Sequence, residues 1–245
     1  MEDTPPNYII EIATSDYETT KAAVEGGADR IELCADLYQG GTTPSFGTIK
    51  KCREAFDIPL YPIIRPRGGD FLYSDEEFEI MLRDIELCKQ LGCDGVVIGC
   101  LKKDGAIPLK KTARLINAAY PMEVTFHRAF DRSIDPLVRL EELINLGVQR
   151  ILTSGQKPVA PDGIDLIAEL VKVANERIII MPGSGVRKEN IRKLAVETGA
   201  VEFHSSLRAT ISSKMEFKHP SFSNESTNPY INPTDVRDLR AALMN

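Results

Sequence analysis

Charged and imidazole side chains recur at the ends of short apolar runs along this chain. Paired carboxylates and imidazoles can divide proton donation and acceptance when their surroundings displace their pKa values. Arginines beside them can bind a carboxylate or phosphate, because a guanidinium presents paired N–H donors in one plane. Three residues of each kind are candidates: Glu11, Glu32 and His127 for acid–base chemistry, and Arg65, Arg67 and Arg128 for binding an anionic substrate.

A glycine pair indicates a second anion-binding feature. Gly183 and Gly185 flank a single serine, and a helix is expected to begin near Val186. Backbone N–H groups and the positive end of a helix dipole bind phosphate at such turns. Ser205 and Ser206, which follow the next apolar run, would add further donors. The alternative is that the glycines only turn the chain.

Some of these side chains are also potential metal ligands. Glu11, Glu32, His127 and His204 can hold a divalent metal through nitrogen and oxygen ligands. The five cysteines, at positions 34, 52, 88, 93 and 100, form no Cys-x-x-Cys pair. Those at 52, 88 and 93 fall on predicted helices or their ends, where we expect them to pack as small apolar side chains. The odd number and an N-terminus without an export signal favour free thiols in a reducing cytoplasm.

The composition is that of an ordinary globular protein. The chain has 245 residues, of which 42% are hydrophobic and 27% charged, so it can form a large core and is not mainly disordered. A net charge of −6 and the lack of any cluster of five basic residues argue against nucleic-acid binding. The longest apolar stretch, 95–101, is far shorter than the roughly 20 residues of a membrane helix. We therefore expect a small-molecule partner, with neither nucleic acid nor membrane.

A recurring sequence pattern predicts the architecture. Four times, an amphipathic segment ends in a glycine and an apolar β-rich run begins a few residues later. The four glycines are Gly27, Gly92, Gly147 and Gly199. Glycine readily adopts the left-handed conformation that ends a helix, so each of these glycines marks a helix stop that leads into a strand. The intervals of 65, 55 and 52 residues each have room for two strand–helix units.

Four more apolar runs complete a set of eight strands, which alternate with eight predicted helices. The added strands start near residues 8, 59, 122 and 177, and the helices cover 15–26, 46–56, 74–91, 108–119, 136–146, 163–175, 187–198 and 233–243. Such alternation predicts a parallel sheet with right-handed crossovers. We predict an α/β fold with one domain over 1–245, a TIM-like (β/α)8 barrel; an open doubly wound sheet is the alternative. The core covers about 8–207, a loop segment 208–232 and a last helix 233–243.

The spacing of polar residues places a site at one end of this barrel. Side chains alternate between the two faces of a strand, so Glu32 shares a face with Cys34, and Glu202 shares one with His204. In such barrels the working residues lie at the C-terminal ends of the strands. If these faces point inward, the charged groups meet inside the barrel. They would form either a ligand site or a network of salt bridges that fills the barrel mouth.

Several motifs resemble those of the CutC copper homeostasis family. They are Gly-Gly-Ala-Asp-Arg-Ile-Glu-Leu-Cys at 26–34, Gly-Gly-Thr-Thr-Pro-Ser at 40–45, Ile-Arg-Pro-Arg-Gly-Gly-Asp-Phe at 64–71, Tyr-Ser-Asp at 73–75, Val-Thr-Phe-His-Arg-Ala-Phe-Asp at 124–131 and Arg-Ile-Leu-Thr-Ser-Gly at 150–155. The resemblance runs from about residue 9 to 207. It implies a TIM-like barrel, a cytoplasmic homo-oligomer such as a dimer, and the binding or handling of copper.

The resemblance points to Cys34 as a Cu(I) ligand, with His127 or His204 in support. Some animal members carry two cysteines suited to Cu(I), but Ala13 occupies the position of the first one here. Cu(I) prefers thiolates, so Cys100 would have to face inward to supply the second.

Three functions therefore stay open at this stage. The resemblance implies copper handling, whereas the Arg/Glu/His set favours an enzyme that acts on a small anionic, even phosphorylated, substrate. A binding or scaffold barrel is the third. The residues define no reaction, so whether the protein is an enzyme is left open.

Overall fold

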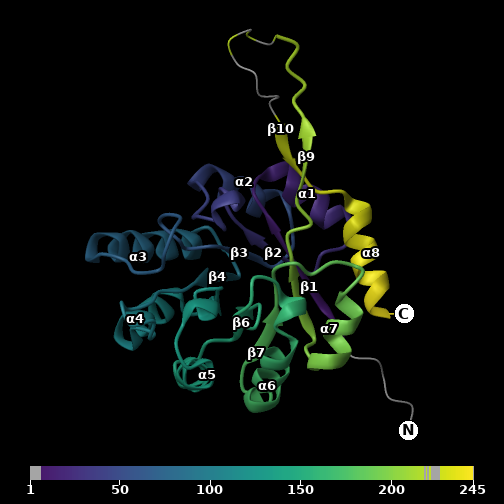
Figure 1. Cartoon of the computed structure of the whole chain (residues 1–245). Helices are drawn as coiled ribbons and strands as arrows, with labels where there is room; N and C mark the ends of the chain where they lie inside the picture. Colours follow the sequence, from purple (N-terminus) through teal and green to yellow (C-terminus); the bar gives the residue numbers. More distant parts are fainter. Residues whose placement is uncertain (1–6, 218, 220, 222–226, 245) are drawn as a thin grey trace.

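The computed structural model describes residues 7–217, 219, 221 and 227–244. Within them, eight parallel strands alternate with eight α-helices, as the sequence predicts (Figure 1). The strands are β1 Ile9–Thr14, β2 Arg30–Leu33, β3 Leu60–Pro62, β4 Gly95–Ile98, β5 Glu123–Phe126, β6 Arg150–Thr153, β7 Ile179–Pro182 and β8 Glu202–Ser205. The helices are α1 Tyr17–Glu25, α2 Phe46–Ala55, α3 Asp75–Gln90, α4 Leu109–Ala119, α5 Pro136–Asn145, α6 Ile164–Ala174, α7 Ile191–Thr198 and α8 Pro233–Met244.

The strands follow one another around a TIM-like barrel. Hydrogen bonds join them in two groups, β3-β2-β1-β8 and β4-β5-β6-β7. Between the groups, the backbone N–H of Ile64 donates to the Val97 carbonyl at 2.8 Å, which connects β3 to β4. At the other junction β7 meets β8 so closely that a Cβ at Gly183 would lie 3.2 Å from the Cβ of His204. The predicted barrel is confirmed.

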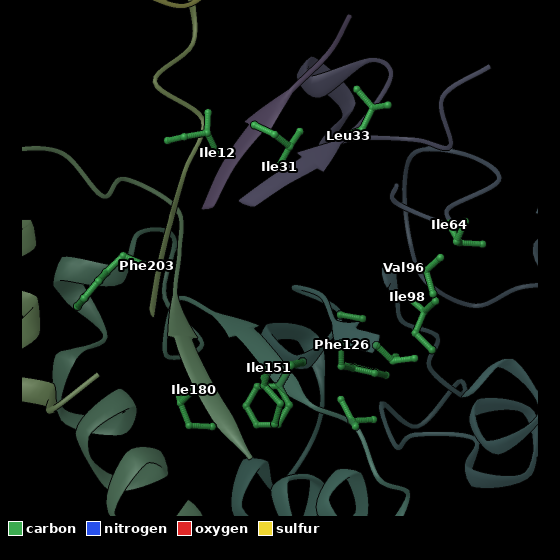
Figure 2. Close-up of a cluster of buried hydrophobic side chains, with 14 of the residues drawn as sticks. Ile12, Ile31, Leu33, Ile64, Val96, Ile98, Phe126, Ile151, Ile180 and Phe203 are labelled. Atoms are coloured by element: carbon green, nitrogen blue, oxygen red, sulfur yellow. The ribbon is translucent and has the colours of Figure 1, made fainter. Parts of the chain in front are cut away.

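Side chains alternate along each strand between the inside of the barrel and the layer between the strands and the helices. On β1, Ile10 and Ile12 are fully buried in the apolar layer between the strands and the helices, whereas Glu11 points into the barrel. Figure 2 shows labelled members of that apolar layer on strands from both groups, among them Ile31, Phe126 and Phe203. Burial of each such side chain stabilises the fold by about 1.5–3 kcal/mol. The apolar layer therefore holds the barrel together, and the inward positions are free to carry polar groups.

Helix α3 shows how the sequence dictates one part of this layer. Phe78, Met81, Ile85 and Cys88 recur at helical spacing and are buried against the barrel. At the start of the helix, Ser74 and Glu77 form a capping box, in which each side chain accepts from the backbone N–H of the other residue. Both features favour a helix over this range, which agrees with the predicted helix 74–91.

Two segments differ from the prediction. Helix α7 begins at Ile191 rather than near Val186, because a turn precedes it in which the Arg187 N–H donates to the side-chain oxygen of Asn190 at 2.9 Å. The segment 208–232, predicted as loop, contains an antiparallel hairpin of β9 Ala209–Ser212 and β10 Thr227–Tyr230. The hairpin projects from the barrel (Figure 1). Serine, asparagine and proline are frequent in this part of the sequence and are typical of loops, so the two short strands were not predicted.

Among the described residues, no helix combines the length and the apolar character that a membrane span requires.

Candidate functional site at the barrel mouth

A pocket of about 280 Å³ opens at the C-terminal end of the barrel strands. Seven of the residues singled out in the sequence line it: Glu32, Arg65, His127, Arg128, Gly185, His204 and Ser206. Arg187 and Arg208 line it as well and were not predicted. Arg187 follows the glycine pair and Arg208 follows the paired serines, so both could have been found from their places in those loops. The structure thus brings most of the candidate residues together.

Two of the candidate residues lie elsewhere. Arg67 turns away from the pocket and pairs with Glu77 and Asp70, while its guanidinium lies over the ring of Tyr73. Strand β3 already ends at Pro62, so the alternation that would put Arg67 on the same side as Arg65 no longer applies. Glu11 lies beneath the pocket and is fully buried.

Two predicted anion-binding residues have structural contacts instead. The Ser205 hydroxyl donates to the Val186 carbonyl at 2.8 Å and accepts from Arg187 at 3.1 Å, which ties the loop after β7 to β8. A Cβ at Gly183 would lie 2.3 Å from a methyl carbon of Leu152, so this glycine allows neighbouring strands to pack closely. Neither residue lines the pocket in the structure, and Gly185 and Ser206 remain as its loop contacts.

Below the pocket, ion pairs fill the other end of the barrel. Arg30 contacts Glu202 at 2.7 Å and Glu11 at 3.3 Å, and Arg150 contacts Glu123 at 2.8 Å and Glu202 at 3.2 Å. We call these five residues the ionic floor. The sequence offered a salt-bridge network and a ligand site as alternatives, but the barrel contains an ion-pair network in one half and a pocket in the other. Strand parity could have revealed Arg30, which shares the inward face of Glu32.

A carboxylate–imidazole–carboxylate series connects the ionic floor to the pocket. His204 Nδ1 lies 2.8 Å from Glu11 Oε1, and His204 Nε2 lies 3.7 Å from Glu32 Oε2. Burial opposes ionisation of Glu11, but the hydrogen bond and charge of His204, together with Arg30 and Arg150, outweigh it and lower its pKa.

The other two members of the series have pKa values shifted upward. Burial and the charge of Glu11 raise the pKa of Glu32 more than His204 lowers it. Burial alone would lower the pKa of His204, but the hydrogen bond to Glu11 and the charges of Glu32 and Glu11 raise it. The series therefore presents a proton acceptor and a proton donor side by side at the pocket wall.

His127 is held as a neutral ring. Burial and the charge of Arg65 lower its pKa to about 3. The Ala129 N–H donates to Nδ1 at 3.1 Å, so the neutral ring carries its hydrogen on Nε2. Among the described residues Nε2 has no hydrogen-bond partner, and such a buried donor costs about 1–3 kcal/mol if it stays unpaired. Gly99 makes room for the ring, because a Cβ there would lie 2.4 Å from it.

Three arginines give the pocket its positive charge. Within the described part of the chain, Arg65, Arg187 and Arg208 have no carboxylate within 4.0 Å, whereas Arg128 pairs with Asp131 at 2.8 Å. Arg65 also holds the surrounding loops, since it donates to three backbone carbonyls, those of Gln39, Gly41 and Gly69.

Backbone donors supplement this charge. Ser184 and Gly185 have φ angles of 74° and 72°, in the left-handed region. In the described chain, the N–H groups of Ser184, Gly185 and Ser206 have no acceptor, and all three residues line the pocket. Successive N–H groups in such a turn form a concave site for an anion. These donors come from the two loops where the sequence predicts anion binding.

The expected copper ligands do not converge. The Cys34 side chain is buried beside Gly41, and burial and the neighbouring Glu32 raise the pKa of its thiol well above the usual range. Cys100 lies on the helix side, 3.6 Å from the hydroxyl of Thr112, so it cannot supply a second inward thiolate. The described residues contain no group of three side chains able to hold a metal ion.

Comparison with known proteins identifies the chain's relatives. The CutC family model matches residues 8–209. The chain belongs to the CutC family. A CutC family protein of Parabacteroides distasonis is 56% identical over 212 residues, which are 86% of this chain and 87% of that protein. A CutC family protein of Chromobacterium violaceum is 45% identical over 241 residues, 96% of this chain and 98% of that one.

A solved CutC structure extends the similarity to the fold. The crystal structure of CutC from Streptococcus agalactiae, a protein named for copper homeostasis, superimposes with a TM-score of 0.78 at 34% identity. The alignment covers 81% of this chain and 98% of that one. The resemblance drawn from the motifs is therefore confirmed at the level of the family and its fold.

Proposed function

We propose that this CutC family protein binds a small anionic molecule in the barrel-mouth pocket and acts on it as an enzyme. The observation that carries this proposal is the group of three arginines, Arg65, Arg187 and Arg208, which face one pocket without carboxylate partners among the described residues. Positive groups held together without counter-charges repel one another. An anion in the pocket relieves this repulsion.

The free backbone donors favour phosphate as the anionic group. The N–H groups of Ser184, Gly185 and Ser206 come from the loops after β7 and β8, where barrels of this type often bind phosphate. A phosphate has enough acceptor oxygens to engage these donors and the arginines together. The volume of about 280 Å³ suits a small metabolite.

Titration with inorganic phosphate at low salt tests the proposal. We expect phosphate to raise the melting temperature of the parent protein by mass action. Arg208→Gln should weaken phosphate binding by about 10- to 100-fold, since a charge-assisted hydrogen bond contributes about 1.5–3 kcal/mol. The matched control is Arg177→Gln, which removes an exposed arginine that pairs with Glu141 outside the pocket. Absence of phosphate stabilisation in the parent, or equal effects of the two variants, would contradict the proposal.

Copper handling is the function that the S. agalactiae relative's name implies. The residues present do not fit a resident Cu(I) site, because one buried thiol with a raised pKa stands without a second inward thiol among the described residues.

The location and assembly implied by the resemblance are also proposals. All five cysteines are free and buried, which suits a reducing cytoplasm. A homodimer is expected, and sedimentation velocity measures the oligomeric state directly.

A further inference from the structure

Glu32 and His204 lie next to each other at the pocket wall, but neither side chain satisfies the other. Their facing atoms, Oε2 and Nε2, are 3.7 Å apart, beyond hydrogen-bond distance. Each atom therefore keeps a position for a bond to a ligand.

Glu11 fixes the orientation of His204. Its carboxylate lies 2.8 Å from Nδ1 and is itself held by Arg30 from the ionic floor. Glu11 is fully buried, so this contact is shielded from solvent. With its Nδ1–H donating to Glu11, His204 presents Nε2 toward Glu32, and Nε2 carries a hydrogen when the ring is protonated, the form that both carboxylates favour.

The pocket lining contains two kinds of groups. Arg187, Arg208 and the free N–H groups of Gly185 and Ser206 can bind an anion. Glu32 and His204 can engage an uncharged fragment of the same ligand. A ligand that uses both needs a negatively charged group and a fragment with both an acceptor oxygen and a removable proton.

We propose that the ligand is a phosphorylated carbonyl compound, and that Glu32 removes a proton from the carbon next to the carbonyl while His204 donates a hydrogen bond to the carbonyl oxygen. A carbonyl oxygen and a hydrogen on the adjacent carbon are close neighbours, so a donor and an acceptor 3.7 Å apart can engage both. The inference rests on the proposed anion binding.

The electron flow balances without a second reactant. The carbon–hydrogen bond breaks, its electron pair forms a carbon–carbon double bond, and the carbonyl π pair moves to the oxygen facing His204. Glu32 holds the proton. Its return to the same carbon restores the substrate. Where the carbon that lost the proton carries a hydroxyl group, the intermediate is an enediol. The proton held by Glu32 can then add to the former carbonyl carbon, while the hydroxyl proton passes through His204 to the other oxygen, which gives the isomer.

Hydrogen–deuterium exchange tests this step. The parent protein is incubated in D₂O with dihydroxyacetone phosphate or ribulose 5-phosphate, and proton NMR follows the signals next to the carbonyl. We expect these signals to disappear for at least one compound, whereas the signals of glycerol 3-phosphate, which has no carbonyl, remain. Glu32→Gln should slow the exchange by about 100-fold or more, the usual effect of a general base. The control Glu141→Gln, on a surface helix, should exchange like the parent.

The variants separate this inference from the proposed function. A Glu32→Gln protein that still melts at a higher temperature with inorganic phosphate, but no longer exchanges the substrate, supports both. A parent protein that binds phosphate and exchanges neither compound overturns the proton-transfer step and leaves anion binding intact. Exchange that persists in Glu32→Gln also overturns it, and points to a contaminating isomerase. A parent that does not bind phosphate overturns the proposed function first.

Discussion

At the scale of single residues, charge alone does not decide a role. Arg65 and Arg67 are two positions apart and carry the same group, but one lines the pocket and the other pairs with Glu77 and Asp70 on the outside. The sequence predicted the residue types at the barrel mouth. It could not predict their partners, because these depend on loop bends after the strands.

His127 should make the protein sensitive to acid. Its pKa is about 3 in the folded state against 6.5 for an ordinary histidine, so the folded state binds fewer protons between these values. Stability from this residue is present above pH 6.5 and falls as the pH drops toward 3, by an amount on the order of 4 kcal/mol. His127→Asn does not titrate there, and its side-chain oxygen can still accept from the Ala129 N–H. Urea unfolding of the variant should therefore show a flatter loss of stability from pH 6.5 to 4 than the parent shows. Parallel curves would contradict this.

The copper expectation can be tested at Cys34. Because its thiol is buried and has a raised pKa, we expect a competing chelator to remove Cu(I) from the parent and from Cys34→Ser equally. The measurement is a Cu(I) titration against a chromophoric chelator. A tight stoichiometric site in the parent that disappears in Cys34→Ser would show copper binding by this thiol.

At the scale of elements, the sequence predicted most of the fold. The glycine-ended segments and apolar runs predict all eight barrel strands, and parity correctly groups Glu202 with His204 on one face of β8, which points into the barrel. The predicted start of α7 near Val186 was wrong, because the Asn190 side chain stabilises a turn there in competition with the helix. Such local side-chain competition is not visible in the apolar periodicity.

Asn190 should matter for anion binding although it does not line the pocket. It accepts from the Arg187 N–H at 2.9 Å and donates to the Gly185 carbonyl at 2.9 Å, so it holds the loop that presents Gly185. Asn190→Ala should destabilise the fold by about 1–2 kcal/mol and weaken phosphate binding. Asn117→Ala on the exposed face of α4 is the matched control. Thermal melts with and without phosphate measure both effects. Unchanged phosphate binding by the variant would show that Asn190 has no role in anion binding.

Gly185 itself is a poorer probe. A side chain there would meet the Val159 Cβ at 2.9 Å, and the φ of 72° disfavours any residue with a Cβ. Its replacement would disturb the fold and the pocket together, so the arginine and asparagine variants are the cleaner tests.

At the scale of the whole molecule, the two halves of the barrel interior differ in how their charges are balanced. The ionic floor is satisfied by its own charges, whereas the pocket keeps unpaired positive groups. Parity predicts that charged residues converge inside the barrel. It does not predict which of them neutralise one another, since that depends on their height along the barrel axis.

Glu202 should be essential to the ionic floor because it contacts both Arg30 and Arg150. Glu202→Gln leaves these buried arginines with less negative charge, so we expect a loss of about 3–5 kcal/mol in the free energy of unfolding. Glu141→Gln removes a surface pair with Arg177 and should cost less than about 1 kcal/mol. Denaturant unfolding compares the two. Similar losses would mean that the floor contributes no more than a surface pair.

The ionic floor also determines how molecules enter and leave the pocket. Glu11, which is fully buried, and the arginine pairs around it occupy the barrel interior below the pocket, so we expect the described barrel to admit a ligand only from the mouth. The product must then leave through the same opening by which the substrate enters. Each occupant blocks the next, and accumulated product should compete directly with incoming substrate.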